Sequence, residues 1–338
     1  MNKTNLFAIL TLAATPAFLH AQITSYSDIV GYQTISVPVG LSTAAFPLLN
    51  ADIVKTSASS LTGNALSLSG ETNVGSKLSS GEPYYIEVYS GALKGDRFDV
   101  NTAATITAAN GTVVLDSASA NNTFSFGSIA AQLDGANVAL RKHITIEQIQ
   151  SMASASLVGN NSASSADQIQ LYDGASSAYA SYFLRGDGIT WRKVGTTTTA
   201  NKTPVPPGTG VFIAKKTGTV NLVSTGSVRN NDFSLPFQTG LQLLAPGFPI
   251  DISASSLGAT SSNGWTGNNS SSSADQIQVY NSGASAYDAY FLRGDGTSWR
   301  KVGTTTTVTG TLATSGQAFF VSRKAQDNNN YLLNPVAP

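Results

Sequence analysis

Residues 160–199 read NNSASSADQIQLYDGASSAYASYFLRGDGITWRKVGTTTT, and residues 268–307 read NNSSSSADQIQVYNSGASAYDAYFLRGDGTSWRKVGTTTT. The two stretches align without gaps at an offset of 108, and 30 of their 40 positions are identical. The same register continues beyond them, since Phe212 aligns with Phe320. Solenoid repeats recur about every 20 to 50 residues. The longer spacing between these two stretches therefore predicts a duplicated domain or half-domain.

Each copy has the sequence pattern of a β-hairpin. Aromatic segments at Tyr179–Leu184 and Tyr287–Leu292 are followed by Gly-Asp-Gly, which favours a turn because glycine adopts positive φ easily. Apolar return strands begin at Trp191 and Trp299, after loops of a length that is usual for hairpins. We therefore expect aromatic strands joined by exposed tips in both copies.

The first half of the chain is also rich in β signals. Residues 84–89 alternate, so that one face carries Tyr84, Ile86 and Val88 and the other carries Tyr85, Glu87 and Tyr89. Further strands are expected at Arg97–Val100, Thr105–Thr107 and Val113–Leu115, and a short helix at Thr145–Ser154.

These patterns predict an all-β protein with β-sandwich or barrel-like modules and an internal duplication in the C-terminal two thirds. The expected boundaries are a signal peptide at 1–21, an N-terminal β domain at 22–130, repeat module 1 at 131–228 and repeat module 2 at 229–338.

Composition excludes several classes of protein. The chain has 338 residues, no cysteine and a formal net charge of zero. Without cysteine there is no disulfide, thiolate zinc site or iron–sulfur cluster. Without net charge there is no electrostatic case for nucleic acid as a partner. Hydrophobic residues make up 41% of the chain, which is enough for a folded core.

The N-terminus has the pattern of a secretory signal peptide. Lys3 supplies the positive charge, Leu6–Leu19 the apolar segment and Ala21 the last residue before cleavage, so that the secreted chain begins at Gln22. The apolar run is too short to span a membrane as a helix, and no later segment is long and apolar enough, so we do not expect an integral membrane protein. We expect the protein to be secreted across the inner membrane and to reside in the periplasm, at the cell surface or in the extracellular space.

Two sequence signatures resemble a family of secreted proteins found mainly in Verrucomicrobia and related bacteria. The first is the opening DIVGYQTISVPVG at residues 28–40. The second is an aromatic strand, a glycine turn, Trp-Arg-Lys-Val-Gly and a strand ending in a basic residue. It occurs at Tyr182–Leu184, Trp191–Gly195 and Pro207–Lys216, and again at Phe291–Leu292, Trp299–Gly303 and Gly316–Lys324. The resemblance implies secretion and a β-rich build, and it supplies no catalytic residue.

Aromatic residues of the hairpins are candidates for a sugar-stacking platform. The candidates are Trp191, Trp299, Tyr182 and Tyr290, together with Tyr179 and Tyr287. The alternative is that these rings pack in the core or against neighbouring strands, as aromatic residues of β domains ordinarily do.

The hairpin tips contain a second candidate site. Arg185, Gly186 and Asp187 spell the adhesion tripeptide Arg-Gly-Asp, and Arg293, Gly294 and Asp295 repeat it. The alternative is turn chemistry, because Gly-Asp-Gly forms tight turns without any ligand.

No catalytic or metal-binding constellation is evident. His143 is the only histidine of the secreted chain, no Gly-x-Ser-x-Gly elbow occurs, and we interpret His143 as a solvated turn or strand residue. The acids that both copies share, Asp167 with Asp275 and Asp187 with Asp295, are expected to anchor turns. We expect no metal and no cofactor.

The sequence thus predicts a secreted, non-enzymatic structural protein of the cell surface or envelope. Serine and threonine, 43 and 36 residues respectively, with only 11% charged residues, suit contact with polysaccharide, matrix components or other copies of the chain. A carbohydrate-binding module built on the aromatic hairpins is the first alternative, and adhesion through the Arg-Gly-Asp turns is the remote one.

Overall fold

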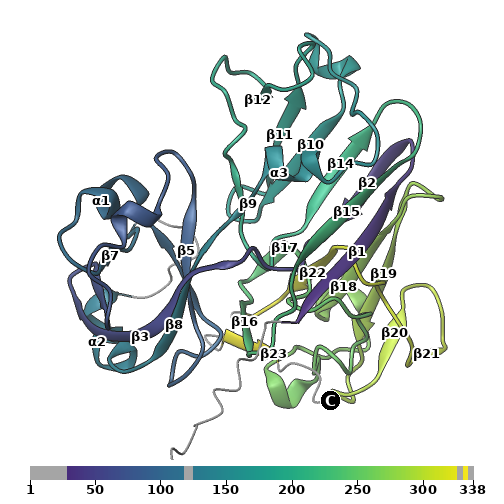
Figure 1. The fold of residues 1–338 in the computed structure, drawn as a ribbon. Helices are drawn as coiled ribbons and strands as arrows, with labels where there is room; N and C mark the ends of the chain where they lie inside the picture. The colour runs from purple at the N-terminus through teal and green to yellow at the C-terminus, as the bar shows by residue number, and fades with distance from the viewer. Residues whose placement is uncertain (1–28, 118–124, 326–329, 334–338) are drawn as a thin grey trace, which may run out of the picture.

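A computed structural model describes residues 29–117, 125–325 and 330–333 of the chain (Figure 1). The predicted signal peptide, residues 1–21, lies outside the described residues. The fold is all-β, as predicted: antiparallel strands form every sheet, and the α-helices are short. None of the helices in the described part is long and apolar enough to cross a membrane.

Two similar β units and one inserted domain make up the described chain. Unit 1 contains a five-stranded sheet of order β12-β11-β10-β14-β2 and a separate ribbon of β1 and β15. Its strands are β1 (Val30–Val37), β2 (Gly40–Ala44), β9 (Ile144–Thr145), β10 (Gln168–Asp173), β11 (Ala178–Leu184), β12 (Trp191–Lys193), β13 (Pro204–Val205), β14 (Val211–Lys215) and β15 (Val220–Ser227). Helix α3 (Ile146–Ser151), at the predicted position, packs into the core between the two sheets.

Unit 2 has the same arrangement. Its sheet has the order β17-β22-β18-β19-β20-β21, and β16 pairs with β23 as β1 pairs with β15. The strands are β16 (Phe233–Pro236), β17 (Gly240–Leu244), β18 (Gln276–Asn281), β19 (Ala286–Leu292), β20 (Trp299–Lys301), β21 (Thr307–Val308), β22 (Phe319–Arg323) and β23 (Asn330–Leu333).

Strand pairing in the two units has the same register at the offset of 108. Ile169 lies opposite Tyr182 in unit 1, and Ile277 lies opposite Tyr290 in unit 2. The predicted hairpins are therefore present in both copies. Gly188 and Gly296 have φ of 73° and 74° at the tips, the left-handed conformation for which glycine was expected.

Residues 52–142 form the inserted domain, which interrupts unit 1 after β2. Its six-stranded sheet has the order β6-β5-β8-β3-β4-β7. The strands are β3 (Asp52–Thr62), β4 (Ala65–Leu68), β5 (Tyr84–Val88), β6 (Arg97–Val100), β7 (Thr112–Val114) and β8 (Asn137–Lys142). Helix α2 (Phe126–Leu133) packs on this sheet and was not predicted.

The expected strand at Thr105–Thr107 is wrong, because these residues end helix α1 (Thr102–Thr107). Asn101 begins this helix, and its side chain accepts the N–H of Ala104 at 3.0 Å. An N-cap of this kind supplies a partner for a backbone donor that the first helical turn leaves free. The cap outweighs the β propensity of the threonines.

Strand pairing divides the chain differently from the boundaries drawn on the sequence. Strand β2 pairs with β14, and β1 pairs with β15 along its whole length. Residues 30–44 therefore belong to unit 1, although the sequence boundaries grouped them with the N-terminal domain at 22–130. A strand needs a hydrogen-bonded neighbour, and here the neighbour lies some 170 residues further along the chain.

An aromatic seam joins the two units. Phe212 and Phe320 lie 6.0 Å apart between ring centroids, Phe212 meets Tyr280 edge-on at 5.7 Å, and Tyr172 meets Phe320 at 5.2 Å. Each contact thus recurs with the roles of the units exchanged, the pattern of a two-fold interface. Each unit also keeps a hydrophobic core of its own, so the copies share a seam and not one core.

Candidate functional site

The predicted tryptophan platform is wrong. Trp191 has 0% and Trp299 has 2% of its surface exposed, and each lies in the core of its unit. Tyr182 is buried as well, and Tyr290 is half-buried against the core of unit 2. Alternation along the strands places these rings on the inner face of each sheet. A second layer in each unit covers this face, so the rings are buried.

Tyr179 and Tyr287 remain as exposed members of the predicted platform. They are 44% and 43% exposed, and they interact with each other across the seam. Each ring packs edge-on against its cross-strand neighbour, Tyr172 or Tyr280, at 5.1 and 5.2 Å between centroids. The pair therefore forms a small rigid aromatic surface.

Both Arg-Gly-Asp tripeptides form hairpin tips, but their carboxylates bind their own turns. The side chain and backbone N–H of Thr190, with the N–H of Ile189, donate hydrogen bonds that lower the pKa of Asp187 to about 2. Asp295 is held in the same way, and Arg293 lies 3.6 Å from its carboxylate. A receptor would have to compete with these contacts, so the turn interpretation is favoured.

Asp167 and Asp275 anchor more than a local turn. The Asp167 carboxylate lies 2.7 Å from Nζ of Lys215 and also accepts the N–H of Val158. Asp275 pairs in the same way with Arg323 at 3.0 Å. All four charged groups are buried, so these ion pairs tie a loop to strand β14 in unit 1 and to strand β22 in unit 2.

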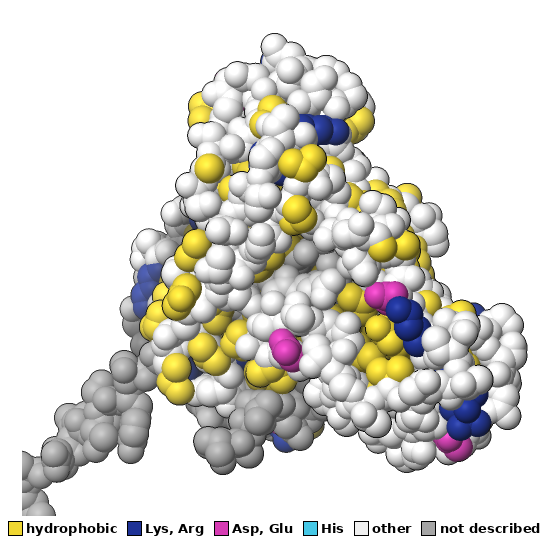
Figure 2. All heavy atoms as spheres, turned by 90° about the vertical axis from the view of Figure 1, so that its right-hand side faces the viewer, with side chains coloured by type: hydrophobic (Ala, Val, Ile, Leu, Met, Phe, Trp, Pro, Cys, Tyr) yellow, Lys and Arg dark blue, Asp and Glu magenta, His cyan; other side chains and the backbone are white. Residues whose placement is uncertain are grey.

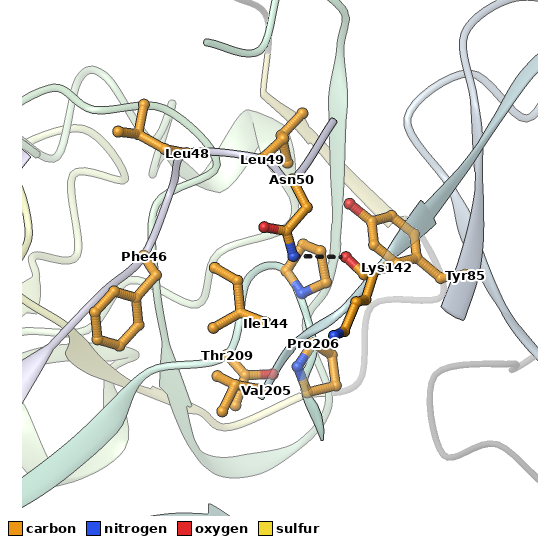
Figure 3. A pocket seen from close by; sticks show the side chains of 11 residues that line it. Phe46, Leu48, Leu49, Asn50, Tyr85, Lys142, Ile144, Val205, Pro206 and Thr209 are labelled. Atoms are coloured by element: carbon orange, nitrogen blue, oxygen red, sulfur yellow. Dashed lines mark hydrogen bonds between the residues drawn. The ribbon is translucent and has the colours of Figure 1, made fainter. Parts of the chain in front are cut away.

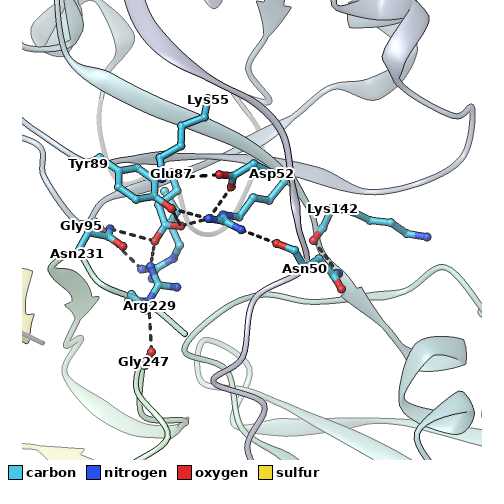
Figure 4. A network of polar contacts seen from close by, with 12 residues as sticks. Asn50, Asp52, Lys55, Glu87, Tyr89, Gly95, Lys142, Arg229, Asn231 and Gly247 are labelled. Atoms are coloured by element: carbon cyan, nitrogen blue, oxygen red, sulfur yellow. Dashed lines mark hydrogen bonds and ion pairs between the residues drawn. The ribbon is translucent and has the colours of Figure 1, made fainter. Parts of the chain in front are cut away.

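A cluster of buried charges lies where the inserted domain meets the segment that links the two units (Figure 4). Glu87, on strand β5, is fully buried. Its carboxylate pairs with the guanidinium group of Arg229, which follows β15, and lies 3.5 Å from Nε of Arg141 on β8. Asn231 donates to the same carboxylate at 3.3 Å.

Arg141 connects this carboxylate to the neighbouring strand. Its guanidinium group lies 2.5 Å from the carboxylate of Asp52 and donates to the hydroxyl of Tyr89 at 2.6 Å. Glu87 and Asp52 thus balance the charges of Arg141 and Arg229. Burial lowers the pKa of Arg229 to about 10, so its guanidinium group remains charged at neutral pH.

The sheet places these groups by alternation. Tyr84, Ile86 and Val88 share one face, as predicted, and this face points into the core of the inserted domain. Glu87 lies on the opposite face, also as predicted. In the fold this face is covered by the segment around Arg229, and no local sequence signal marks that distant segment as its partner.

The cavity beside this cluster is too small for a substrate (Figure 3). It has a volume of about 10 Å³ and lies where the chain enters and leaves the inserted domain, with Asn50 donating to the carbonyl of Lys142 at 3.0 Å. A volume of this size holds about one water molecule. An open groove of about 760 Å³ has Glu147 as its one titratable lining residue, and Glu147 is paired with Lys202.

His143 is buried, and the interpretation as a solvated residue is wrong. Its Nε2 lies 3.0 Å from the carboxylate of Asp99, and its ring centroid is 4.6 Å from that of Tyr85. The residue follows β8 on the covered face of the inserted sheet, which explains its burial. Throughout the described ranges, no three histidine, aspartate or glutamate residues gather in a way that could hold a metal ion.

A second ionic group joins the inserted domain to unit 1. Glu82 lies 2.6 Å from Nζ of Lys142 and also pairs with Lys202, which pairs in turn with Glu147. Burial raises the pKa of Glu82, but hydrogen bonds from Lys142 and Lys202 outweigh it, and the net pKa is lowered. The group therefore stabilises the fold above the pKa of an unfolded glutamate, about 4.3, and this contribution is lost as the pH falls through the lower folded value.

Replacing Lys202 with methionine is expected to lower the melting temperature by about 1–3 °C at pH 7 and by less at pH 3. An exposed ion pair contributes at most about 1 kcal/mol, and the contribution of Glu82 is lost as the pH falls through its lowered folded pKa. Thermal unfolding at both pH values measures the difference. Lys193→Met is the matched control, since Lys193 is exposed and has no ion pair within the described chain. Equal effects of Lys202→Met at both pH values would contradict the assignment.

Comparisons of the chain with family models, with curated proteins and with solved structures gave no match. The resemblance to the secreted family of Verrucomicrobia therefore stays a prediction. The candidate sites depend on the geometry of this chain alone.

Proposed function

We propose that this protein is a secreted, non-enzymatic structural component of the cell surface or envelope. The observation that carries the proposal is the role of the Glu87 cluster, a buried group of titratable side chains. Its charges join the inserted domain to the segment between the two units, and the cavity beside it has room for about one water. Small-molecule sites usually have volumes of about 300–1,000 Å³ around their polar groups.

The surface also supports a structural role. Figure 2 shows a face on which charged side chains are few and lie in small separate groups among polar and hydrophobic ones. Such a surface repels neither neutral polymers nor other copies of the chain. The aromatic seam and the buried ion pairs hold the three large sheets together without disulfides, which suits a protein that must persist outside the cell.

The test is protease treatment of intact native cells, followed by fractionation and detection of the protein. We expect cleavage on intact cells, or recovery with the insoluble envelope or in the medium, while a periplasmic marker stays protected. Protection until the outer membrane is breached, together with recovery as a soluble monomer, would overturn the proposal.

A second candidate function is carbohydrate binding at the Tyr179–Tyr287 pair. The favouring observation is that two half-exposed rings pack edge-on against their cross-strand neighbours on the two sides of the seam. Rigid aromatic faces with a polar tip suit sugar rings, which present apolar faces and hydroxyl edges.

Replacing both Tyr179 and Tyr287 with alanine is expected to reduce retention on an insoluble polysaccharide about tenfold, if this site binds sugar. Retention is measured by pull-down over a panel of polysaccharides, with Val194→Ala as the control for an apolar residue exposed elsewhere. Melting temperatures show whether each variant is folded. Unchanged retention of a folded double variant would remove this candidate.

A further inference from the structure

Strand β1 has an open edge in the part of the chain that the structure describes. The carbonyl of Ile29, just before the strand, accepts a hydrogen bond from the N–H of Val228. This bond fixes which residues of β1 direct their backbone N–H and C=O groups toward β15. The N–H and C=O groups of the alternate residues point away from β15. Within the described chain no hydrogen bond reaches these groups, and all four residues are exposed: Val30, Tyr32, Thr34 and Ser36.

The matching edge in unit 2 is covered. Strand β16 has the place in unit 2 that β1 has in unit 1, and Ser234 of β16 corresponds to Ser36. The N–H of Ser234 donates to the carbonyl of Gly95, in a turn of the inserted domain, at 3.1 Å. Gly95 has φ of 87°, and a Cβ atom there would lie 2.8 Å from the nitrogen of Ser234. The covered edge thus receives a closely packed main chain.

Each edge borders a groove at the seam. The groove in unit 2 has a volume of about 300 Å³, includes Tyr172 and Gln242 in its walls, and is entered by Arg97 of the inserted domain. The groove beside β1 has a volume of about 290 Å³ and is lined by the equivalent Tyr280 and by Ser42. The described chain has one inserted domain. This domain covers the edge of β16 and leaves the equivalent edge of β1 open.

We propose that the open edge of β1 pairs with β1 of a second copy in antiparallel orientation. With Gln33 of both copies on the two-fold axis, Tyr32 lies opposite Thr34 of the second copy and Val30 lies opposite Ser36. In this register the outward N–H and C=O groups of both strands find partners. The pairing also covers the side chains of Tyr32 and Val30, which are 76% and 72% exposed.

The composition of β1 favours a second copy over a charged partner. The strand reads VGYQTISV, and neither it nor the adjoining Pro38 and Val39 contains a charged residue. Self-pairing therefore brings no like charges together, and it places an aromatic residue opposite a β-branched one. Edges that must stay single usually carry lysine, proline within the strand or a bulge, and β1 has none of these.

This inference deepens the structural role proposed above and rests on it, because a surface layer needs contacts between copies. A single pair of strands buries less surface than a permanent dimer, so we expect reversible association that strengthens where copies are crowded. The two proposals fail separately. A β1 dimer confined to the periplasm would remove the surface role, whereas a monomer exposed on the cell would remove the β1 contact.

Sedimentation equilibrium of the purified secreted protein tests the contact. We expect a concentration-dependent dimer, and we expect Tyr32→Lys to raise its dissociation constant about tenfold or more by placing like charges at the interface. Val223→Lys is the matched control. Val223 is exposed on the same face of the ribbon as Tyr32 but lies on β15. The other edge of β15 is already hydrogen-bonded to residues 152–154, so β15 has no place in the proposed contact. A wild-type protein that is monomeric at about 1 mM, or equal effects of both substitutions, would overturn the proposal.

Cross-linking keeps the test independent of any loss of stability. The chain has no cysteine, so a mixture of Tyr32→Cys and Thr34→Cys variants reports only new contacts. In the proposed register these residues face each other across the two strands, and mild oxidation is expected to link the mixture faster than either variant alone. If the edge is instead covered by residues 22–28 of the same chain, no such preference appears and the proposal fails.

Discussion

Replacing Glu87 with glutamine is expected to lower the free energy of unfolding by about 3–5 kcal/mol. The substitution keeps the shape of the side chain and removes its charge, which leaves the guanidinium groups of Arg229 and Arg141 buried with one carboxylate fewer. Removing one partner of a buried ion pair costs this much because the remaining charge has lost its hydration and its counterion. Urea unfolding followed by circular dichroism measures the loss.

Glu71→Gln is the matched control for this prediction. Glu71 pairs with Lys77 at 2.6 Å on the surface, so its replacement is expected to cost less than about 1 kcal/mol. Adding Arg229→Met to Glu87→Gln is expected to recover part of the loss, because the second change removes the unpaired charge. A Glu87→Gln protein as stable as the Glu71→Gln protein would show that the cluster does not hold the inserted domain in place.

Replacing Trp191 or Trp299 with alanine is also expected to cost about 3–5 kcal/mol, because each ring fills the core of its unit. Each indole N–H is also satisfied, by the side chain of Gln150 at 2.6 Å and by the carbonyl of Ala259 at 2.7 Å. The variants would leave a cavity and an acceptor without its donor. Thermal and urea unfolding measure both losses.

Ile189→Ala is the control within the same hairpin as Trp191. Ile189 is 69% exposed, so its replacement is expected to change stability by no more than about 0.5 kcal/mol. Any loss of polysaccharide retention in the tryptophan variants should follow their unfolding. Variants that keep the wild-type melting temperature but lose retention would instead restore the tryptophan platform.

Local signals in the sequence predicted much of the secondary structure. The Gly-Asp-Gly turns, the aromatic strands and the alternation through Glu87 were all legible, because turn chemistry and a two-residue period act within a few residues. The helix over Thr102–Thr107 was missed, since the cap at Asn101 decides it against the propensity of the threonines.

The candidate sites were predicted less well. Both tryptophans were legible as strand residues, yet their burial depends on a second layer contributed by distant strands. The burial of Glu87 and His143 had no local signal either, because the segments that cover them lie elsewhere in the chain. Of the exposed aromatic residues, only the Tyr179–Tyr287 pair belonged to the predicted platform.

By itself the sequence determined that this is an all-β protein with two copies of one hairpin pattern, because alternation, turns and repetition are properties of neighbouring residues. Only the tertiary structure decided that the first strands belong to unit 1, that charges join the inserted domain to the linker and that β1 keeps an open edge within the described residues. These features depend on hydrogen bonds and ion pairs between residues far apart in the chain, and neither periodicity nor composition records such partners.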